Sequence, residues 1–322
     1  MISNHFFEVI CCPKCKSDVI ESSENELTCT GCKSKYPIVN NIFMMLDESD
    51  DKVSQIIKNF YNTAWKRDSG GQLKGKIAHE DMSNLGQNYI QMNEKRFLPL
   101  FTNQKGTFFL DAATGAQPRV EFGQKFSYHI CVDFCLEGLM ESKKILGDRA
   151  ICVLGSLLNL PIKSSMCDGI IASHCIYHID KDLQHKAISE LLRVLGPEKQ
   201  MLIFYANPKS FEQKIISLVK GLLKSNVAKR KSENHNNFYY YAHTIKSMVK
   251  IFLSTSNNLH ITVKPLRMCS KTVSEILFRF KPLGYLFYNI LTFAERFILS
   301  RKGLLMASYV SYIIKKNGLR SS

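Results

Sequence analysis

The sequence predicts an α/β protein whose main domain is a doubly wound, mostly parallel sheet, preceded by a small cysteine-rich module. Three observations predict this fold. From Thr107 onward, short apolar runs alternate with segments of helical periodicity. Each of these runs ends near a polar residue. Two Cys-x-x-Cys pairs lie within the first 46 residues, ahead of the alternating region. Strands that alternate with helices form right-handed βαβ units, and such units build a parallel sheet.

The elements of the main domain follow from this alternation. We expect strands at 108–110, 129–132, 150–154, 169–172 and 201–205. Helices are expected at 136–146 and 181–195. In the second helix an apolar residue recurs at every fourth position from Leu183 to Leu195, and Gly196-Pro197 ends it.

Beyond residue 205 the pattern loosens. We expect an amphipathic helix at 211–224, a basic polar stretch at 229–231, and strands at 260–266 and 308–315 on either side of a long apolar helical region. The apolar run 283–294 is interpreted as core in preference to a helix lying on a membrane. The predicted organisation is a cysteine-rich module at 1–46, a linker and helical lid at 47–105, and the main domain at 106–322 with a substrate-side insertion around 206–258.

The totals restrict location and partners. The 322 residues carry a formal charge of +15, which favours nucleic acid, anionic lipid or a phosphorylated substrate as partner. We find no positively charged leader ahead of an apolar stretch, and no apolar run of the roughly 18–20 residues that cross a bilayer. We therefore expect a cytoplasmic protein, with peripheral attachment to the inner membrane face as an option.

The two cysteine pairs predict a structural zinc site. Thirteen residues separate Cys12-Pro-Lys-Cys15 from Cys29-Thr-Gly-Cys32, and each pair offers two thiolates to one metal. Four thiolates fill the tetrahedral shell of Zn²⁺, and a module this small needs the metal to fold. A redox dithiol is the alternative, which two pairs at this spacing disfavour.

This segment, together with Leu27, Tyr36-Pro37-Ile38 and Met45-Leu46, resembles the zinc-ribbon family that includes the Trm112 methyltransferase activator. The resemblance implies a module that stands beside or is fused to a methyltransferase. Asn40-Asn41 departs from the Asp-Gly usual in that family, and this change affects a turn.

Acidic and small residues follow the predicted strands in a definite order. The first strand leads through Asp111 into Ala-Ala-Thr-Gly115-Ala, a small-residue turn that lets backbone amides approach a ligand. The second strand ends at Asp133, about 20 residues on, where an acid accepts hydrogen bonds from ribose hydroxyls. Gly155-Ser-Leu follows the third strand, and Ser173-His174 ends the fourth.

This ordered set, closed by Leu192-Arg-Val-Leu-Gly-Pro197, resembles class I S-adenosylmethionine (SAM)-dependent methyltransferases of the methyltransferase-11 type over about residues 105–207. The resemblance implies a Rossmann-like sheet with an antiparallel final strand. It implies that SAM's methionine part borders Asp111, Ala113 and Gly115, its ribose Asp133, and its adenine Phe134, Ser156 and Leu157. Ser173 and His174 would line the floor between cofactor and acceptor.

The departures from that family concern cofactor affinity. Glycine is usual at Ala113 and Gln117, and an acid at Ser156. Alanine is tolerated if its backbone keeps a negative φ, and a serine hydroxyl still pairs with an adenine amine. A degenerate copy without catalysis stays an alternative. Binding of nicotinamide dinucleotide is rejected, because the G-x-G-x-x-G turn is missing.

The candidate general bases are His174 and His178, which follow the fourth strand, with Tyr177 and Tyr205 as weaker candidates on the same rim. For either histidine alone, a structural role is an equal alternative. Tyr177 to Gln184 and Phe238 to His243 are similar to bacterial surface-polysaccharide and glycolipid methyltransferases. This similarity implies O-methylation of a sugar or lipid-linked sugar. The alternatives are an RNA methyltransferase, which the charge fits, and a non-catalytic scaffold.

Overall fold

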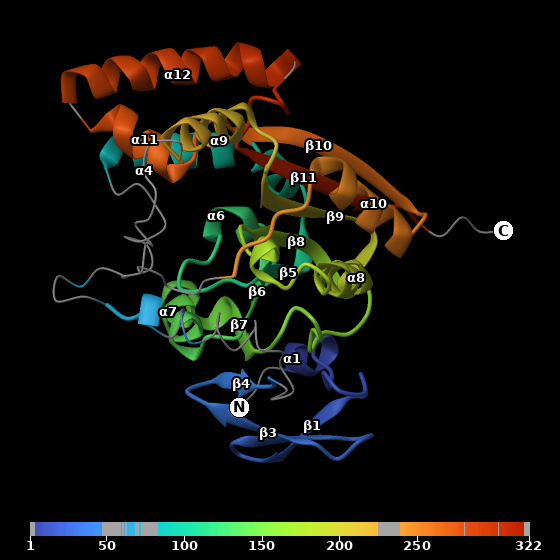
Figure 1. Ribbon diagram of the computed structural model, residues 1–322. Helices are drawn as coiled ribbons and strands as arrows, with labels where there is room; N and C mark the ends of the chain where they lie inside the picture. The colour runs from blue at the N-terminus through green and yellow to red at the C-terminus, as the bar shows by residue number, and fades with distance from the viewer. Residues whose placement is uncertain are drawn as a thin grey trace.

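The computed structural model forms a single continuous sheet with helices on both faces (Figure 1). It describes residues 4–46, 59, 61, 63–67, 71, 83–224, 239–279, 281–301 and 303–318. Over these residues the strand order is β1-β2-β3-β4-β7-β6-β5-β8-β9-β11-β10.

The main domain contributes seven strands. They are β5 (Gly106–Ala112), β6 (Phe126–Asp133), β7 (Ala150–Leu154), β8 (Cys167–Ser173), β9 (Leu195–Ala206), β10 (Leu259–Arg267) and β11 (Tyr309–Lys316). Strands β7, β6, β5, β8 and β9 run parallel, while β11 pairs antiparallel with both β9 and β10. The predicted doubly wound sheet with an antiparallel last strand is therefore confirmed.

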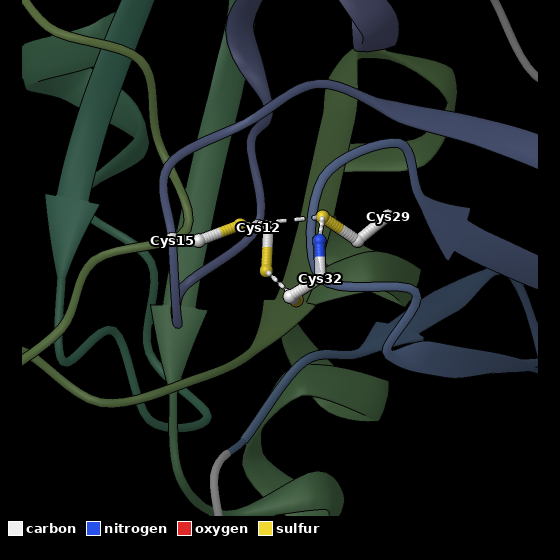
Figure 2. A group of neighbouring side chains, drawn as sticks. All are labelled: Cys12, Cys15, Cys29 and Cys32. Atoms are coloured by element: carbon white, nitrogen blue, oxygen red, sulfur yellow. Dashed lines mark hydrogen bonds between the residues drawn. The ribbon is translucent and has the colours of Figure 1, made fainter.

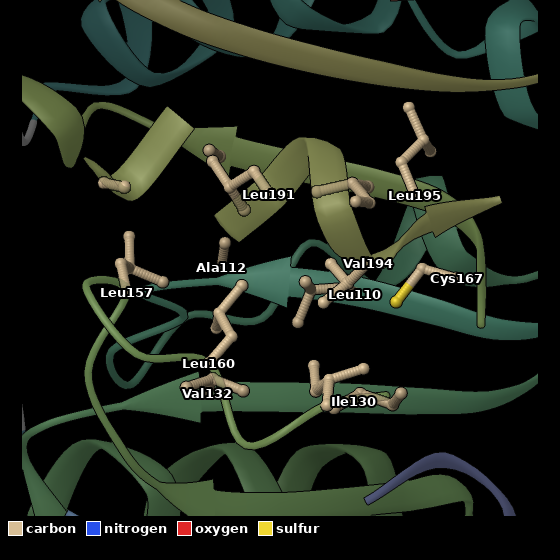
Figure 3. Packing of buried hydrophobic residues seen from close by; sticks show 14 of the residues in the cluster. Leu110, Ala112, Ile130, Val132, Leu157, Leu160, Cys167, Leu191, Val194 and Leu195 are labelled. Atoms are coloured by element: carbon tan, nitrogen blue, oxygen red, sulfur yellow. The ribbon is translucent and has the colours of Figure 1, made fainter. Parts of the chain in front are cut away.

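Alternate residues of the central strands face opposite helical layers. One face packs on α8 (Gln184–Val194) and α10 (Ile245–Thr255). Figure 3 shows Leu110 of β5 below helix α8 and Val132 of β6 beside Leu160, all within one buried cluster. On the other face, the strands pack against α5 (Pro99–Thr102) and α6 (Val120–Gly123) in an aromatic cluster. On the same face they pack against α7 (Leu136–Leu146) in an aliphatic cluster. The pleat thus carries one strand's side chains into two cores.

The cysteine-rich module is built into this sheet. It comprises α1 (Asn4–Val9), β1 (Val19–Ser23), β2 (Glu26–Cys29), β3 (Lys35–Val39) and β4 (Ile42–Met44). Strand β4 pairs in parallel with β7, with Ile42 opposite Cys152. Phe6 stacks on Phe43 with ring centroids 3.8 Å apart, and both belong to the same buried cluster as Val153. The module and the main domain share one hydrophobic core.

Polar contacts reinforce this junction. The Lys16 ammonium, in the first cysteine turn, donates to the Leu160 carbonyl at 3.0 Å and forms a 2.9 Å ion pair with Glu190 of α8. A backbone bridge joins Ile10 to Ile162. The module therefore contacts both the sheet edge and the helix that covers it.

Three helices stand at the opposite end of the molecule: α9 (Phe211–Lys224), α11 (Lys271–Phe278) and α12 (Lys281–Arg301) (Figure 1). The inner side of α12 and α11 packs on α4 (Asn84–Lys95), where Tyr89 and Phe278 are buried. The outer side of α12 is apolar and exposed. Its large exposed side chains include Leu283 (53%), Leu286 (54%), Phe287 (40%), Ile290 (54%) and Phe293 (64%).

These exposures correct one prediction. Run 283–294 was interpreted as core, but the helix buries a mixed face that includes Glu295 and leaves its apolar row outward. Glu295 is held by the Tyr89 hydroxyl, by Asn93 Nδ2 at 3.1 Å and by the Met268 amide at 2.7 Å. Within the described ranges, no helix combines the length and apolar character that crossing a bilayer requires.

The predicted elements agree with the observed ones within a few residues. Each expected strand overlaps an observed one, and 136–146 and 211–224 coincide with α7 and α9. The helix expected at 181–195 is observed at Gln184–Val194, and Gly196-Pro197 lies within β9, which begins at Leu195. The basic stretch 229–231 and most of 47–82 lie outside the described residues.

Candidate active site and cysteine cluster

A cavity of about 380 Å³ opens where the parallel strands end. Sequence reasoning nominated two candidate bases and eight cofactor contacts, and every one of them lines this cavity. They are His174 and His178, with Asp111, Ala113, Gly115, Asp133, Phe134, Ser156, Leu157 and Ser173. Residues from β5, β6, β7 and β8 thus converge on one space, as expected at the carboxyl edge of a parallel sheet.

The turn after β5 is fixed by the acid at the end of β6. The Gly115 amide donates to Asp133 Oδ2 at 2.8 Å, and the Cys135 amide donates to Oδ1 at 2.8 Å. The two oxygens together offer about four acceptor sites, so capacity remains for a ligand hydroxyl beside these donors. Asp133 is buried, and this burial raises its pKa to about 6, although the backbone amides of Cys135, Gly115 and Phe134 lower it.

Ala113 departs from expectation in its backbone. Its φ is +55°, in the left-handed region, whereas tolerance of alanine was predicted for a negative φ. That condition is not met, because the Ala113 amide turns back to donate to the Val132 carbonyl at 2.8 Å. An alanine there costs about 1–2 kcal/mol relative to ordinary backbone. The position retains the geometry that glycine satisfies without strain.

Gly115 also has a positive φ, of +58°, and is covered by an aromatic side chain. A Cβ built on Gly115 would lie 2.6 Å from Trp65 Cζ2. Trp65 stacks on Tyr61 with ring centroids 5.5 Å apart, and Tyr61 in turn meets Phe134 edge-on. Burial and the nearby Asp133 carboxylate raise the pKa of the Tyr61 hydroxyl. This aromatic cover closes the cavity above the turn.

The carboxylate of Asp111 already has contacts within the protein. Its Oδ2 accepts from the Arg119 amide at 2.6 Å and lies 3.3 Å from His129 Nε2. Asp111 therefore shapes the turn. At the far side, Ser156 Oγ accepts from the Leu158 amide at 3.2 Å, and Leu157 is buried beside it.

His174 presents an imidazole without a hydrogen bond. Both ring nitrogens are buried, and neither has a hydrogen-bond partner among the described residues; the nearest acid is Glu94, whose Oε1 lies 3.9 Å from Nε2. Burial, followed by the charges of Arg267 and Arg119, lowers its pKa well below 6.5, so the ring is neutral at physiological pH. Its φ of +57° is a strained conformation for a non-glycine residue, and such strain concentrates at functional sites.

The other rim candidates differ. His178 lines the cavity, and its Nδ1 lies 3.1 Å from the Tyr239 carbonyl, which restrains the ring. Tyr177 is buried and lines the cavity between the two histidines. Tyr205 is not part of the lining. Its hydroxyl donates to Gln184 Oε1 at 2.8 Å beneath α8, so the prediction that placed it on the rim was wrong.

Several charged and aromatic lining residues were missed by sequence reasoning. Glu94 of α4 forms a 2.7 Å ion pair with Arg119 Nη1, and Arg119 Nη2 donates to Ser173 Oγ at 2.7 Å. Arg267 ends β10 and lies over the Tyr309 ring, with Cζ 4.3 Å from its centroid. No spacing signal links these residues, because helix packing and the order of the last strands bring them together.

The four predicted metal ligands form one cluster. Figure 2 shows Cys12, Cys15, Cys29 and Cys32 directed toward a common centre, and their sulfurs lie within 4.8 Å of one another. Sγ of Cys12 lies 3.6 Å from that of Cys32, and Sγ of Cys15 lies 3.4 Å from that of Cys29. Thiolates around one zinc at 2.3 Å stand about 3.8 Å apart, so this donor set fits Zn²⁺. Tyr36 Oη lies 3.0 Å from Cys12 Sγ as an outer contact.

Comparison with known proteins finds two families along the chain. Residues 5–41 match the family of Trm112p-like proteins, and residues 110–203 match a methyltransferase domain. A UPF0434 protein of Nitrosococcus oceani is 43% identical over 42 residues, which are 13% of this chain and 71% of that protein.

Solved structures share the fold at low identity. Geranyl diphosphate C-methyltransferase from Streptomyces coelicolor A3(2) aligns with a TM-score of 0.51 and 12% identity, covering 83% of this chain and 98% of that one. Phosphoethanolamine N-methyltransferase 2 from Haemonchus contortus aligns with a TM-score of 0.45 and 15% identity, covering 71% of this chain. The chain spans 52% of the length of that enzyme.

Proposed function

The chain belongs to the Trm112p-like family in its N-terminal segment and is a SAM-dependent methyltransferase in its main domain. We propose that it methylates an oxygen atom of a small-molecule acceptor, namely a sugar or a lipid-linked sugar. One observation carries the proposal. The turn that would hold the cofactor and the unpaired imidazole of His174 line the same cavity.

The cofactor end of the cavity fits SAM by its donor set. Asp133 offers free lone pairs to the ribose diol, and the turn at Gly115 permits close approach of the amino-acid tail. Phe134 and Leu157 supply apolar contacts for the adenine. When bound, SAM supplies a methyl group activated by a sulfonium.

The acceptor end suits a hydroxyl group. His174 is neutral and holds no internal hydrogen bond, so a ring nitrogen is available to take the acceptor's proton. Tyr177 and Tyr240 line the walls beside it and exclude water. A proton-accepting group is what an oxygen acceptor needs and an amine does not, which favours O-methylation.

The acceptor assignment is tested with SAM carrying a labelled methyl group. The protein is incubated with nucleotide sugars, with lipid-linked sugars extracted from bacterial membranes, and with total RNA, and the label in each fraction is counted. Label in a sugar fraction, located on oxygen by mass spectrometry, is the expected result. Label in the RNA fraction would show that RNA is the acceptor and would overturn the sugar assignment. No label in any fraction, with SAM binding intact, would indicate a scaffold.

We also propose that the outer row of α12 rests on an anionic membrane surface. Leu283, Leu286, Phe287, Ile290 and Phe293 form one exposed stripe at helical spacing. Three exposed basic residues lie nearby: Lys214 on α9, Arg279 in the turn between α11 and α12, and Arg296 on α12. An apolar stripe with basic neighbours fits an interface of anionic lipid, and the formal charge of +15 favours the same partner.

The cysteine cluster is proposed to hold one structural Zn²⁺. The sulfur separations match a tetrahedral shell, and four thiolates leave no open position for catalysis. The metal would then support the strand pairing of β4 with β7 from outside the active site.

A further inference from the structure

The acceptor end of the cavity contains a buried arginine that the methyl transfer described above does not use. Arg267 is 8% exposed, lines the cavity, and stacks on Tyr309, its register partner at the start of β11. Its Nε is buried and has no hydrogen-bond partner among the described residues. A buried guanidinium with an unused donor is costly unless a ligand supplies the acceptor.

The acidic residue nearest to Arg267 in the cavity lining is already paired with another arginine. Glu94 is the acidic lining residue on this side, and it is paired with Arg119 at 2.7 Å. Its field also acts on Arg267, so one carboxylate serves two guanidinium groups. His174 stands between them as a neutral ring. Among the described residues, no carboxylate forms an ion pair with Arg267 itself, whereas Arg119 has Glu94.

The sheet order separates this charge from the cofactor. Asp133, Gly115 and Ser173 follow β6, β5 and β8, whereas Arg267 ends β10, four strands from β5. Neighbouring strands lie about 4.8 Å apart, which puts the β10 backbone roughly 19 Å from the turn after β5. Between the two positions lies His174 at the end of β8. Arg267 thus lies on the acceptor side of the proposed methyl-transfer position.

We propose that Arg267, held by Tyr309, binds an anionic group of the acceptor, a phosphate or diphosphate, while the hydroxyl to be methylated faces His174. The guanidinium would donate Nε–H and an Nη–H to two oxygens of one anion, as arginine does with phosphate. This inference rests on the proposed methyl transfer and names the chemical class of its acceptor.

The test measures binding of inorganic pyrophosphate and phosphate by calorimetry, with and without saturating S-adenosylhomocysteine (SAH). The variants are Arg267→Met, Arg267→Lys and, as a control that also removes one positive charge, Lys125→Met at an exposed position before β6. Arg267→Met should bind pyrophosphate about 10–100-fold more weakly, because a charged hydrogen-bonded pair is lost. Arg267→Lys should lose less affinity for pyrophosphate, and Lys125→Met should match the wild type. SAH affinity should stay within about twofold in all variants.

The outcomes separate cleanly. Pyrophosphate binding that Arg267→Met leaves intact, or wild-type protein that binds neither anion at millimolar concentration, overturns the inference. Loss of SAH binding in a folded Arg267→Met protein also overturns it, by assigning the arginine to the cofactor. If wild-type protein binds pyrophosphate through Arg267 but not SAH, the anion site stands and the methyl-transfer proposal fails. If Arg267→Met unfolds at a lower temperature than the wild type, the test rests on Arg267→Lys, which keeps the charge and changes the donor geometry. Weaker pyrophosphate binding by Arg267→Lys then supports the inference, and unchanged binding overturns it.

The source of the anion is read from a second competition. Uridine diphosphate and a short-chain prenyl diphosphate are each titrated against bound pyrophosphate. Displacement by the first at lower concentration indicates a nucleotide-linked acceptor, and displacement by the second indicates a lipid-linked acceptor. Displacement by neither, with Arg267-dependent pyrophosphate binding, excludes diphosphate esters of these kinds and overturns the diphosphate assignment.

Discussion

The amide of Gly115 and the carboxylate of Asp133, 18 positions apart in the chain, are joined by a 2.8 Å hydrogen bond that ties the turn after β5 to the end of β6. The two parts of the proposed cofactor site are therefore positioned together. A change at either residue is expected to disturb both the amino-acid tail and the ribose contacts.

Replacing Asp133 with asparagine should weaken SAH binding about 10–100-fold, because the ribose diol loses a charged acceptor. An amide also offers an N–H where the Gly115 or Cys135 amide now donates. Calorimetry with SAH measures the change, and the exposed Asp148→Asn is the matched control. Unaltered affinity in a folded Asp133→Asn protein would remove the ribose assignment.

The affinity for SAH should depend on pH through Asp133. Burial raises the pKa of this carboxyl to about 6, so it is ionised above pH 6 and protonated below. Binding that requires the carboxylate is then constant from pH 7 to 8 and weakens roughly tenfold per pH unit below the pKa. Titrations from pH 5 to 8 measure this, and Asp133→Asn should flatten the curve. A flat wild-type curve contradicts the role.

His174→Gln should lower turnover about 10²–10⁴-fold with SAH affinity preserved, because the ring is proposed to accept a proton and not to hold the cofactor. The assay follows labelled methyl transfer into whichever fraction the wild type labels. His185→Gln, at an exposed position on α8, should behave as wild type. The lowered pKa of His174 predicts that this histidine causes no loss of rate between pH 6.5 and 8. Turnover close to wild type in His174→Gln would make the histidine structural.

Removal of the metal should destabilise the entire chain. The cysteine-rich module shares a core and a strand pairing with the main domain, so chelation is expected to lower one common melting transition. A loss of about 3 kcal/mol corresponds to about 6–12 °C for domains of 150–250 residues. Cys29→Ser should also lose the bound zinc measured by mass spectrometry, whereas Lys14→Ser in the neighbouring turn should keep it. Two separate transitions, with the larger unmoved by chelator, would show that the module is energetically independent.

A charge placed on the outer row of α12 should abolish membrane attachment. Wild-type protein is expected to float with vesicles containing phosphatidylglycerol and much less with pure phosphatidylcholine. The double variant Phe287→Glu and Ile290→Glu should reduce flotation about tenfold or more. Each substitution would place a charge at the boundary between the lipid headgroups and the acyl chains. Ile145→Glu, equally exposed on α7, is the control. No flotation combined with dimers in light scattering would assign the row to a second copy of the chain.

The fold was predictable because its strands have a strong local signal. The runs that became β5 to β9 are short, apolar and bounded by turn residues, and their alternation with helices determines a parallel sheet. The exposed row on α12 could not be predicted in this way. Periodicity identifies an apolar face, but it does not tell which neighbour covers that face, and here the inner side is organised around Glu295 instead.

The site was predictable where residues follow strands in order and not where distant elements meet. Asp111 and Asp133 lie at the carboxyl ends of β5 and β6, and His174 follows β8, so their placement results from the parallel register. Arg267 and Glu94 belong to β10 and α4, and tertiary packing alone brings them to the cavity. The positive φ of Ala113 was missed for a related reason, since its conformation is set by the hydrogen bond to Val132 in the neighbouring strand.

The parallel pairing of β4 with β7 has a consequence for producing the protein in pieces. All five residues of β7 are buried, and β4 covers its outer hydrogen-bonding edge. A truncated chain that starts after residue 82 would expose that row of amides and carbonyls flanked by apolar side chains, a template for strand addition by other copies. Such a fragment should aggregate on refolding, and supplying the cysteine-rich module, residues 1–46, in trans should restore solubility.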